Sequence, residues 1–192
     1  MQKLVVINAC VRGGDSRTLK IAQPIIEALS KHYEITRYDL PEMNIVPLNP
    51  VLFEERGKGE IPVWAREAAS AIAHADRILI AAPFWDMSFP AVLRCFFEQL
   101  SLFDVTFTDN GKTCVGLCQA PKVLYITTRG MDIATGSELE QATPYLKALS
   151  HLWNLGPLTT IAVHNTDYLT AEELEKRMAD AILTGTELAK TW

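Results

Sequence analysis

Residues 4–18 read LVVINACVRGGDSRT, which is the pattern of a buried strand, a turn and the start of a helix. The run Leu4–Ile7 is apolar without alternation, which is typical of a parallel strand covered on both faces of its sheet. Gly13 and Gly14 allow the backbone to turn tightly, and apolar residues at helical spacing begin at Leu19. A strand that leads through a turn into a helix is the repeating unit of an α/β fold.

The same unit recurs along the chain. Further apolar runs lie at Ile78–Ala82, Val123–Ile126 and Ile161–Val163, with a weaker candidate at Glu34–Tyr38. The intervening segments have helical spacing, with apolar stripes that begin at Leu19, Trp64, Leu93, Tyr145 and Leu174. Five β–α units predict a doubly wound, three-layer α/β fold whose five-stranded parallel sheet has the order 2-1-3-4-5. No repeat or domain boundary interrupts them, so one domain is expected over residues 1–192.

Capping residues and prolines refine the expected helix limits. Thr170–Glu173 forms a capping box at the start of the last helix, and Gly156 is placed where a glycine would end the preceding helix. Pro24 lies inside the first expected helix and removes a hydrogen bond there, so we expect a bend. The connections 39–61 and 128–143 are long for a compact domain, which makes them candidates for lids over a site.

Composition limits the possible partners. The formal net charge is -5 and no basic run flanks an aromatic cluster, so nucleic acid is not an expected partner. No apolar stretch approaches the roughly 20 residues of a membrane span, and the N-terminus does not resemble a signal peptide, so we expect a cytoplasmic protein without a membrane partner. The cysteines lack a second Cys or His pair at zinc-ligand spacing, so no metal site is expected at Cys10, Cys95, Cys114 or Cys118.

The loop after the first strand has the features of a phosphate site. Ser16 and Thr18 place hydroxyls at a helix N-terminus, where free N–H groups and the helix dipole attract an anion, and Arg17 can add a charged contact. Asp15 should then face away from the anion or cap the helix. Without a ligand, the same residues would form an ordinary capped turn.

Known phosphate motifs match this loop poorly. It contains neither G-x-x-x-x-G-K-[ST] nor G-x-G-x-x-G, which excludes a P-loop and removes the dinucleotide fingerprint. Low-molecular-weight tyrosine phosphatases have a similar fold and the loop C-x5-R-[ST]. Here six residues separate Cys10 from Arg17, and the chain has no Asp-Pro for the general acid. A phosphatase-like enzyme is therefore a weaker alternative.

Two further loops complete the expected site. Pro83–Met87 follows the third strand with aromatic and thioether side chains, which suit either a flat ring system or ordinary core packing. Thr128–Met131 follows the fourth strand, and Gly130 would let the backbone approach the edge of a ligand. The three loops would bind a phosphate, a planar ring and the rim of that ring, and they meet at the switch point between strands one and three. This combination fits FMN better than a dinucleotide.

At these residues the chain resembles the FMN-dependent NADH azoreductases and the wider NAD(P)H:quinone oxidoreductases of the flavodoxin-like fold. The likeness covers nearly the whole chain and is densest at Ala81–Met87, Val105–Phe107, Asp109–Gly111 and Ile126–Gly130. It implies a homodimer with the active sites at the subunit interface. The apolar face around Leu93, Phe96, Phe97, Leu100 and Phe103 suits such a contact or an ordinary core. The implied FMN-binding residues are Cys10, Ser16, Arg17, Thr18, Pro83, Phe84, Trp85, Asp86, Met87, Thr128, Arg129, Gly130 and Met131.

Three positions depart from the family pattern: Cys10 stands for a serine, Asp86 for an asparagine and Met131 for a glycine. The resemblance implies transfer of a hydride from NADH or NADPH to FMN, and then of two electrons to a quinone, azo or nitro compound. No side chain is assigned as a catalytic acid or base. A flavodoxin-type electron carrier and a regulatory FMN-binding protein are the remaining alternatives.

Overall fold

A computed structural model describes all residues from Met1 to Trp192. The main sheet is parallel and contains β1 (Gln2–Asn8), β2 (Tyr33–Asp39), β3 (Arg77–Ala81), β6 (Val123–Thr128) and β7 (Leu158–Val163). Its order is β2-β1-β3-β6-β7. Both the five predicted strands and the order 2-1-3-4-5 are confirmed. The order of successive strands reverses between β1 and β3, as in a doubly wound fold.

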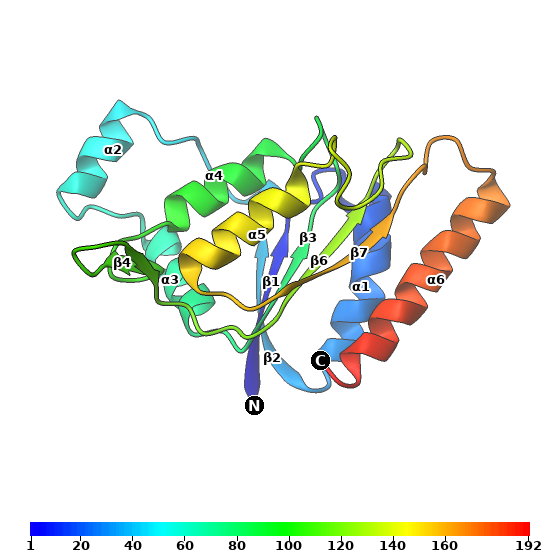
Figure 1. Cartoon of the computed structure of the whole chain (residues 1–192), viewed down its shortest axis with the longest axis horizontal. Helices are drawn as coiled ribbons and strands as arrows, with labels where there is room; N and C mark the ends of the chain where they lie inside the picture. Colours follow the sequence, from blue (N-terminus) through cyan, green and yellow to red (C-terminus); the bar gives the residue numbers. More distant parts are fainter.

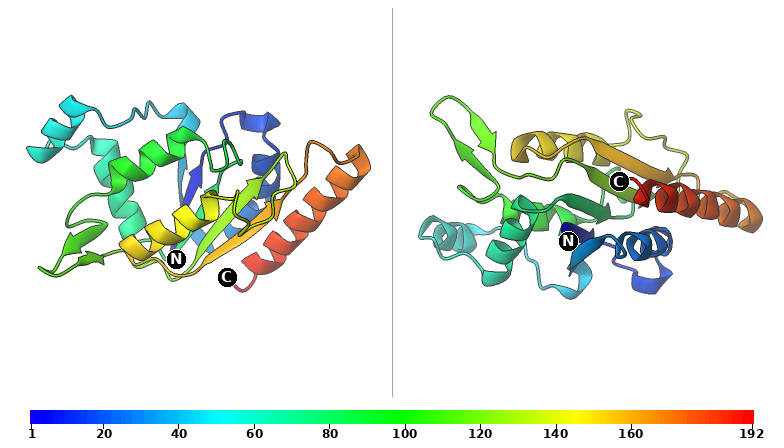
Figure 2. Two further views of the ribbon diagram at one scale, coloured as in Figure 1. Left: turned by 45° about the horizontal axis from the view of Figure 1, so that its top comes forward. Right: turned by 90° about the horizontal axis from the view of Figure 1, so that it is seen from below.

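Helices cover both faces of the sheet (Figures 1 and 2). On one face lie α1 (Arg17–Leu29) and α6 (Ala171–Ala189), and on the other lie α3 (Val63–Ala73), α4 (Ala91–Leu100) and α5 (Ala142–Trp153). None of the helices combines the length and the apolar character that a membrane crossing would require.

Alternate residues of each central strand enter different cores. Val5 and Ile7 of β1 pack with the α3, α4 and α5 layer, whereas Leu4 and Val6 pack with α1 and α6. All four side chains are at most 2% exposed. A strand buried on both faces has no solvent-facing position, which explains the continuous apolar runs in the sequence.

The apolar face of α4 belongs to the core. Leu93, Phe96, Phe97 and Leu100 are at most 2% exposed, and only Phe103, beyond the helix, is 59% exposed. Of the two interpretations of this face, the structure supports core packing. The four buried residues are therefore unavailable for a contact between subunits.

A short helix and a two-stranded hairpin have no counterpart in the sequence prediction. The connection 39–61 contains the short helix α2 (Pro50–Gly57), and an antiparallel pair, β4 (Phe107–Asp109) and β5 (Cys114–Gly116), follows α4. The strands of the pair are too short to show alternation in the sequence, and α2 has no buried residue to reveal its period.

Helix limits follow the capping signals with one correction. The capping box is confirmed, because Glu173 N donates to Thr170 Oγ1 and Thr170 N donates to Glu173 Oε2. The prediction for Gly156 is wrong: α5 ends at Trp153, and its C-cap is Asn154, whose φ of 61° is left-handed. Gly156 instead packs so closely on the Pro121 carbonyl that a Cβ would overlap it. Helix α1 continues through Pro24, and the bend there stays a prediction.

Candidate functional site

Four loops meet at the carboxyl ends of β1, β3, β6 and β7, on the upper side of the sheet in Figure 1. They enclose a hollow of about 190 Å³. Doubly wound folds bind ligands at this edge, beside the reversal of strand order. The hollow is lined by Arg12, Ser16, Arg17, Pro83, Phe84, Trp85, Thr128, Gly130, Thr166 and Asp167.

The first loop brings the N-terminus of α1 to this hollow. Ser16 is the N-cap, and its Oγ accepts from Leu19 N at 3.3 Å. The first amides of a helix have no intrahelical acceptor, and the first turn of α1 contains no acidic residue. Asp15 is exposed and outside the hollow, as expected. The positive end of α1 therefore faces the hollow together with Arg12 and Arg17.

Arg17 lines the hollow but already has partners. Its Nη1 donates to Asp167 Oδ1 at 2.6 Å and to Thr166 Oγ1 at 2.9 Å. Its side chain is 37% exposed and that of Asp167 is 60% exposed. An incoming anion would therefore meet an arginine that is paired with a carboxylate.

Cys10 and Thr18, both expected to bind phosphate, are buried behind the hollow. The Cys10 thiol is directed to Ala81 O at 3.6 Å, and burial raises its pKa to about 11. Thr18 Oγ1 lies 2.7 Å from Thr128 Oγ1 and accepts from Thr128 N at 3.1 Å. Neither side chain lines the hollow, so their contacts join the first loop to the ends of β3 and β6.

The burial of Cys10 also bears on the phosphatase alternative. A thiol acts as a nucleophile in its thiolate form, and a side chain that is 1% exposed with a raised pKa holds its proton. Cys10 therefore lacks both the access and the charge that a phosphatase nucleophile needs.

The second loop forms a tight turn that presents Trp85. Trp85 N donates to Ser88 O at 3.1 Å and Ser88 N donates to Trp85 O at 2.8 Å. The intervening Asp86 and Met87 have φ values of 47° and 62°, a combination that costs a side chain such as Met some strain. Pro83, Phe84 and Trp85 line the hollow, whereas Asp86 and Met87 lie beyond its rim.

The predicted residues of the third loop differ in whether they line the hollow. Thr128 and Gly130 line the hollow, and Met131 is 43% exposed outside it. Arg129 is fully buried, and its guanidinium donates to Ile133 O at 2.8 Å and to Thr135 Oγ1 at 3.0 Å.

Arg129 also connects the second loop to the segment before α5, through contacts with Phe84 and Glu140. Its guanidinium carbon lies 5.4 Å from the centre of the Phe84 ring, and Nη2 lies 3.8 Å from Glu140 Oε1. Burial lowers the pKa of Arg129 below its ordinary value. The side chain of Arg129 therefore supports the second loop from the interior and does not line the hollow.

A fourth loop, after β7, was missed by the sequence prediction, as was Arg12. Thr166 and Asp167 line the hollow. The backbone of this loop is bonded to the third loop through Asn165 N to Met131 O, Thr166 N to Arg129 O and Asp167 N to Gly130 O, at 2.9–3.1 Å. The predicted topology could have identified this loop, because the loop after a fifth parallel strand begins at the same edge of the sheet.

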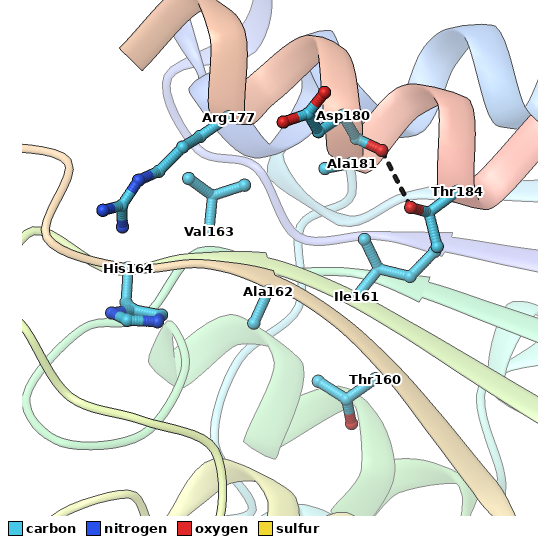
Figure 3. A pocket seen from close by; sticks show the side chains of 9 residues that line it. All are labelled: Thr160, Ile161, Ala162, Val163, His164, Arg177, Asp180, Ala181 and Thr184. Carbon is cyan, nitrogen blue, oxygen red and sulfur yellow. Dashed lines mark hydrogen bonds between the residues drawn. The ribbon is translucent and has the colours of Figure 1, made fainter. Parts of the chain in front are cut away.

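A second hollow, of about 350 Å³, lies between β7 and α6 (Figure 3). Arg177, Asp180 and Thr184 of α6 face Ile161 and Val163 there, and Thr184 Oγ1 donates to Asp180 O at 2.8 Å. Thr160 and His164 point to the other side of β7. None of the predicted binding residues lines it. It lies at the edge of the sheet, away from the reversal of strand order, so the smaller hollow is the candidate site.

Ligand groups for a metal ion are not assembled in this structure. No group of three or more His, Cys, Asp and Glu side chains is placed to hold one. The four cysteines are all unpaired.

Comparison with known proteins identifies a matching family and relatives that align over nearly the whole chain. A family model described as a flavodoxin-like fold matches residues 2–184. An FMN-dependent NADH:quinone oxidoreductase 2 from Clostridium acetobutylicum is 30% identical over 203 residues, with 99% of each chain covered. An FMN-dependent NADH:quinone oxidoreductase from Clostridium perfringens is 29% identical over 198 residues, again with 99% of each chain covered.

Solved structures agree on the fold. An azoreductase from Bacillus anthracis has a TM-score of 0.85 at 17% identity, with both chains fully covered. An FMN-dependent NADH-azoreductase from the same species, solved in complex with FMN, has a TM-score of 0.80 at 19% identity, covering 98% of this chain and all of the other.

Proposed function

The chain belongs to the flavodoxin-like fold family, and from that premise we propose that it moves two electrons from NADH through FMN to a quinone, azo or nitro compound. FMN-dependent oxidoreduction is the activity named for relatives that match almost its full length, and it is the activity of this chain. The preferred acceptor and the residues that hold the cofactor are part of the proposal.

One observation carries the residue assignment: the N-terminus of α1 and an exposed aromatic side chain line the same hollow. The first amides of α1, the Ser16 hydroxyl and the two arginines, Arg12 and Arg17, suit a phosphate. Trp85 is 41% exposed at the rim, although a large aromatic residue without a ligand is normally buried. These groups fit the two ends of FMN.

The residues around the hollow would bind and orient the cofactor. FMN supplies a ring that accepts a hydride and passes two electrons on. Pro83, Phe84 and Trp85 would face the ring, and Gly130 lines the same hollow. Arg129 holds Phe84 from the interior. The hollow contains no histidine or thiol, and its one carboxylate, that of Asp167, is paired with Arg17, so we assign no proton-transferring side chain.

We also propose a homodimer joined at the carboxyl edge of the sheet. Apolar side chains cluster along its loops: Val11, Trp85, Met87, Met131 and Leu139 are 36–58% exposed. Apolar surface beside a site is typical of an interface between subunits. Sedimentation equilibrium is expected to give twice the chain mass of 21.4 kDa. A single species of 21.4 kDa at micromolar concentration would contradict the dimer.

The test of the oxidoreductase is a spectrum before and after addition of NADH under nitrogen. A yellow protein is expected, and NADH should remove nearly all of its visible flavin absorption because the ring accepts a hydride. Adding menadione in excess should restore the colour and support continued NADH oxidation. A flavodoxin-type carrier would show essentially no steady turnover, and a phosphatase would be colourless and would hydrolyse p-nitrophenyl phosphate.

A further inference from the structure

The proposed phosphate site contains a carboxylate. Asp167 lines the same hollow as Ser16, Arg12 and Arg17, and its Oδ1 accepts from Arg17 Nη1 at 2.6 Å. The other lining residues carry no charge at neutral pH. Two arginines therefore face one aspartate, and the formal charge of the hollow is reduced from two positive to one.

The backbone fixes the position of this carboxylate. Asp167 N donates to Gly130 O at 3.1 Å, and Thr166 N and Thr166 Oγ1 both donate to Arg129 O, at 3.0 and 3.1 Å. A Cβ at Gly130 would overlap the Asp167 carboxylate, so the glycine allows this close approach. Asp167 is thus held against the third loop and is not a freely moving surface side chain.

The geometry points to Asp167 as a residue that sets the affinity for the phosphate of FMN. Its carboxylate is paired with Arg17 and repels a phosphate that enters the hollow, so FMN binds less tightly than it would without this charge. This inference rests on the proposed function, because it takes the hollow as the phosphate site. The side chain of Asp167 is 60% exposed, so solvent screens the repulsion and its effect is moderate.

A merely structural role for Asp167 predicts the opposite sign. If its ion pair only positioned Arg17 for the phosphate, removal of the charge would leave Arg17 less ordered and weaken FMN binding. The two roles are therefore separated by the direction in which the affinity changes.

The test is Asp167→Asn, which keeps the shape and a hydrogen-bond acceptor for Arg17 but removes the charge. FMN and riboflavin, which lacks the phosphate, are titrated into the apoprotein and followed by flavin fluorescence. We expect the dissociation constant of FMN to fall roughly five- to tenfold and that of riboflavin to stay within about twofold. Inorganic phosphate should also compete better against FMN in the variant.

Asp132→Asn is the matched control. Asp132 is an exposed carboxylate that is paired with His164 and lies outside the hollow, so its removal changes the net charge equally. It should leave both dissociation constants within about twofold.

Three outcomes would overturn the inference. Unchanged or weaker FMN binding by Asp167→Asn would show that Asp167 does not repel the phosphate. Equal tightening of FMN and riboflavin would show that the phosphate is not involved. Failure of the wild-type protein to bind either flavin would overturn the proposed cofactor site itself.

Discussion

Replacing Glu140 by alanine is expected to lower the free energy of unfolding by about 3–5 kcal/mol, because it leaves a buried cation without its counter-charge. Arg129 and Glu140 are both fully buried, with 3.8 Å between Nη2 and Oε1. Burial lowers the pKa of Arg129, and Glu140 is the main influence that raises it again. Glu140 Oε1 also accepts from Thr143 N at 2.8 Å, so the variant leaves an amide at the start of α5 without a partner.

Urea denaturation measures the loss, and the melting temperature should fall by about 10 °C. Glu54→Ala is the control, since Glu54 of α2 forms an exposed pair with Lys58, four residues on at the C-cap of that helix. Its removal should cost no more than about 0.5 kcal/mol. Equal losses in the two variants would show that the buried pair does not hold the third loop to α5.

Replacing Ser16 by aspartate is expected to weaken FMN binding on the order of a hundredfold while the protein stays folded. Asp caps a helix as well as Ser does and interacts favourably with the helix dipole, so α1 keeps its N-cap. The added carboxylate stands where Ser16 now lines the hollow at the first turn of α1, and it would repel a phosphate held there.

Ser16→Asn separates charge from shape, because Asn also caps but carries no charge. It should bind FMN within about fivefold of the wild type, and riboflavin should bind all three proteins alike. Fluorescence titration gives the constants and circular dichroism verifies the fold. If aspartate and asparagine weakened FMN binding equally, the phosphate would not lie at the start of α1.

The strands and their order could be predicted because they follow from local pattern and general packing rules. The apolar runs at Leu4–Ile7 and Val123–Ile126 correspond to strands that helices cover on both faces. The hairpin β4–β5 could not be predicted in this way. Its strands have three residues each and are exposed or half-buried, so they carry no hydrophobic period.

The candidate site was predicted in part. The three loops meet as expected because parallel strands end at one edge of the sheet, and Ser16, Arg17, Thr128 and Gly130 line one hollow. The predicted set also contained residues whose side chains lie elsewhere: Thr18 bonds to Thr128 from 110 residues away. The loop after β7 begins at the same edge but was not among the predicted loops, so Asp167 was missed.

The sequence by itself determined the strand–helix alternation, the parallel sheet and the edge at which a ligand would bind, because hydrophobic period and capping are properties of neighbouring residues. Only the tertiary structure decided which loop side chains face that ligand. Arg129 turns inward to Glu140, and Arg17 is joined to Asp167 across 150 residues. These directions depend on partners from distant loops, because a charged side chain takes the orientation in which its charge is paired, and no local pattern encodes that partner.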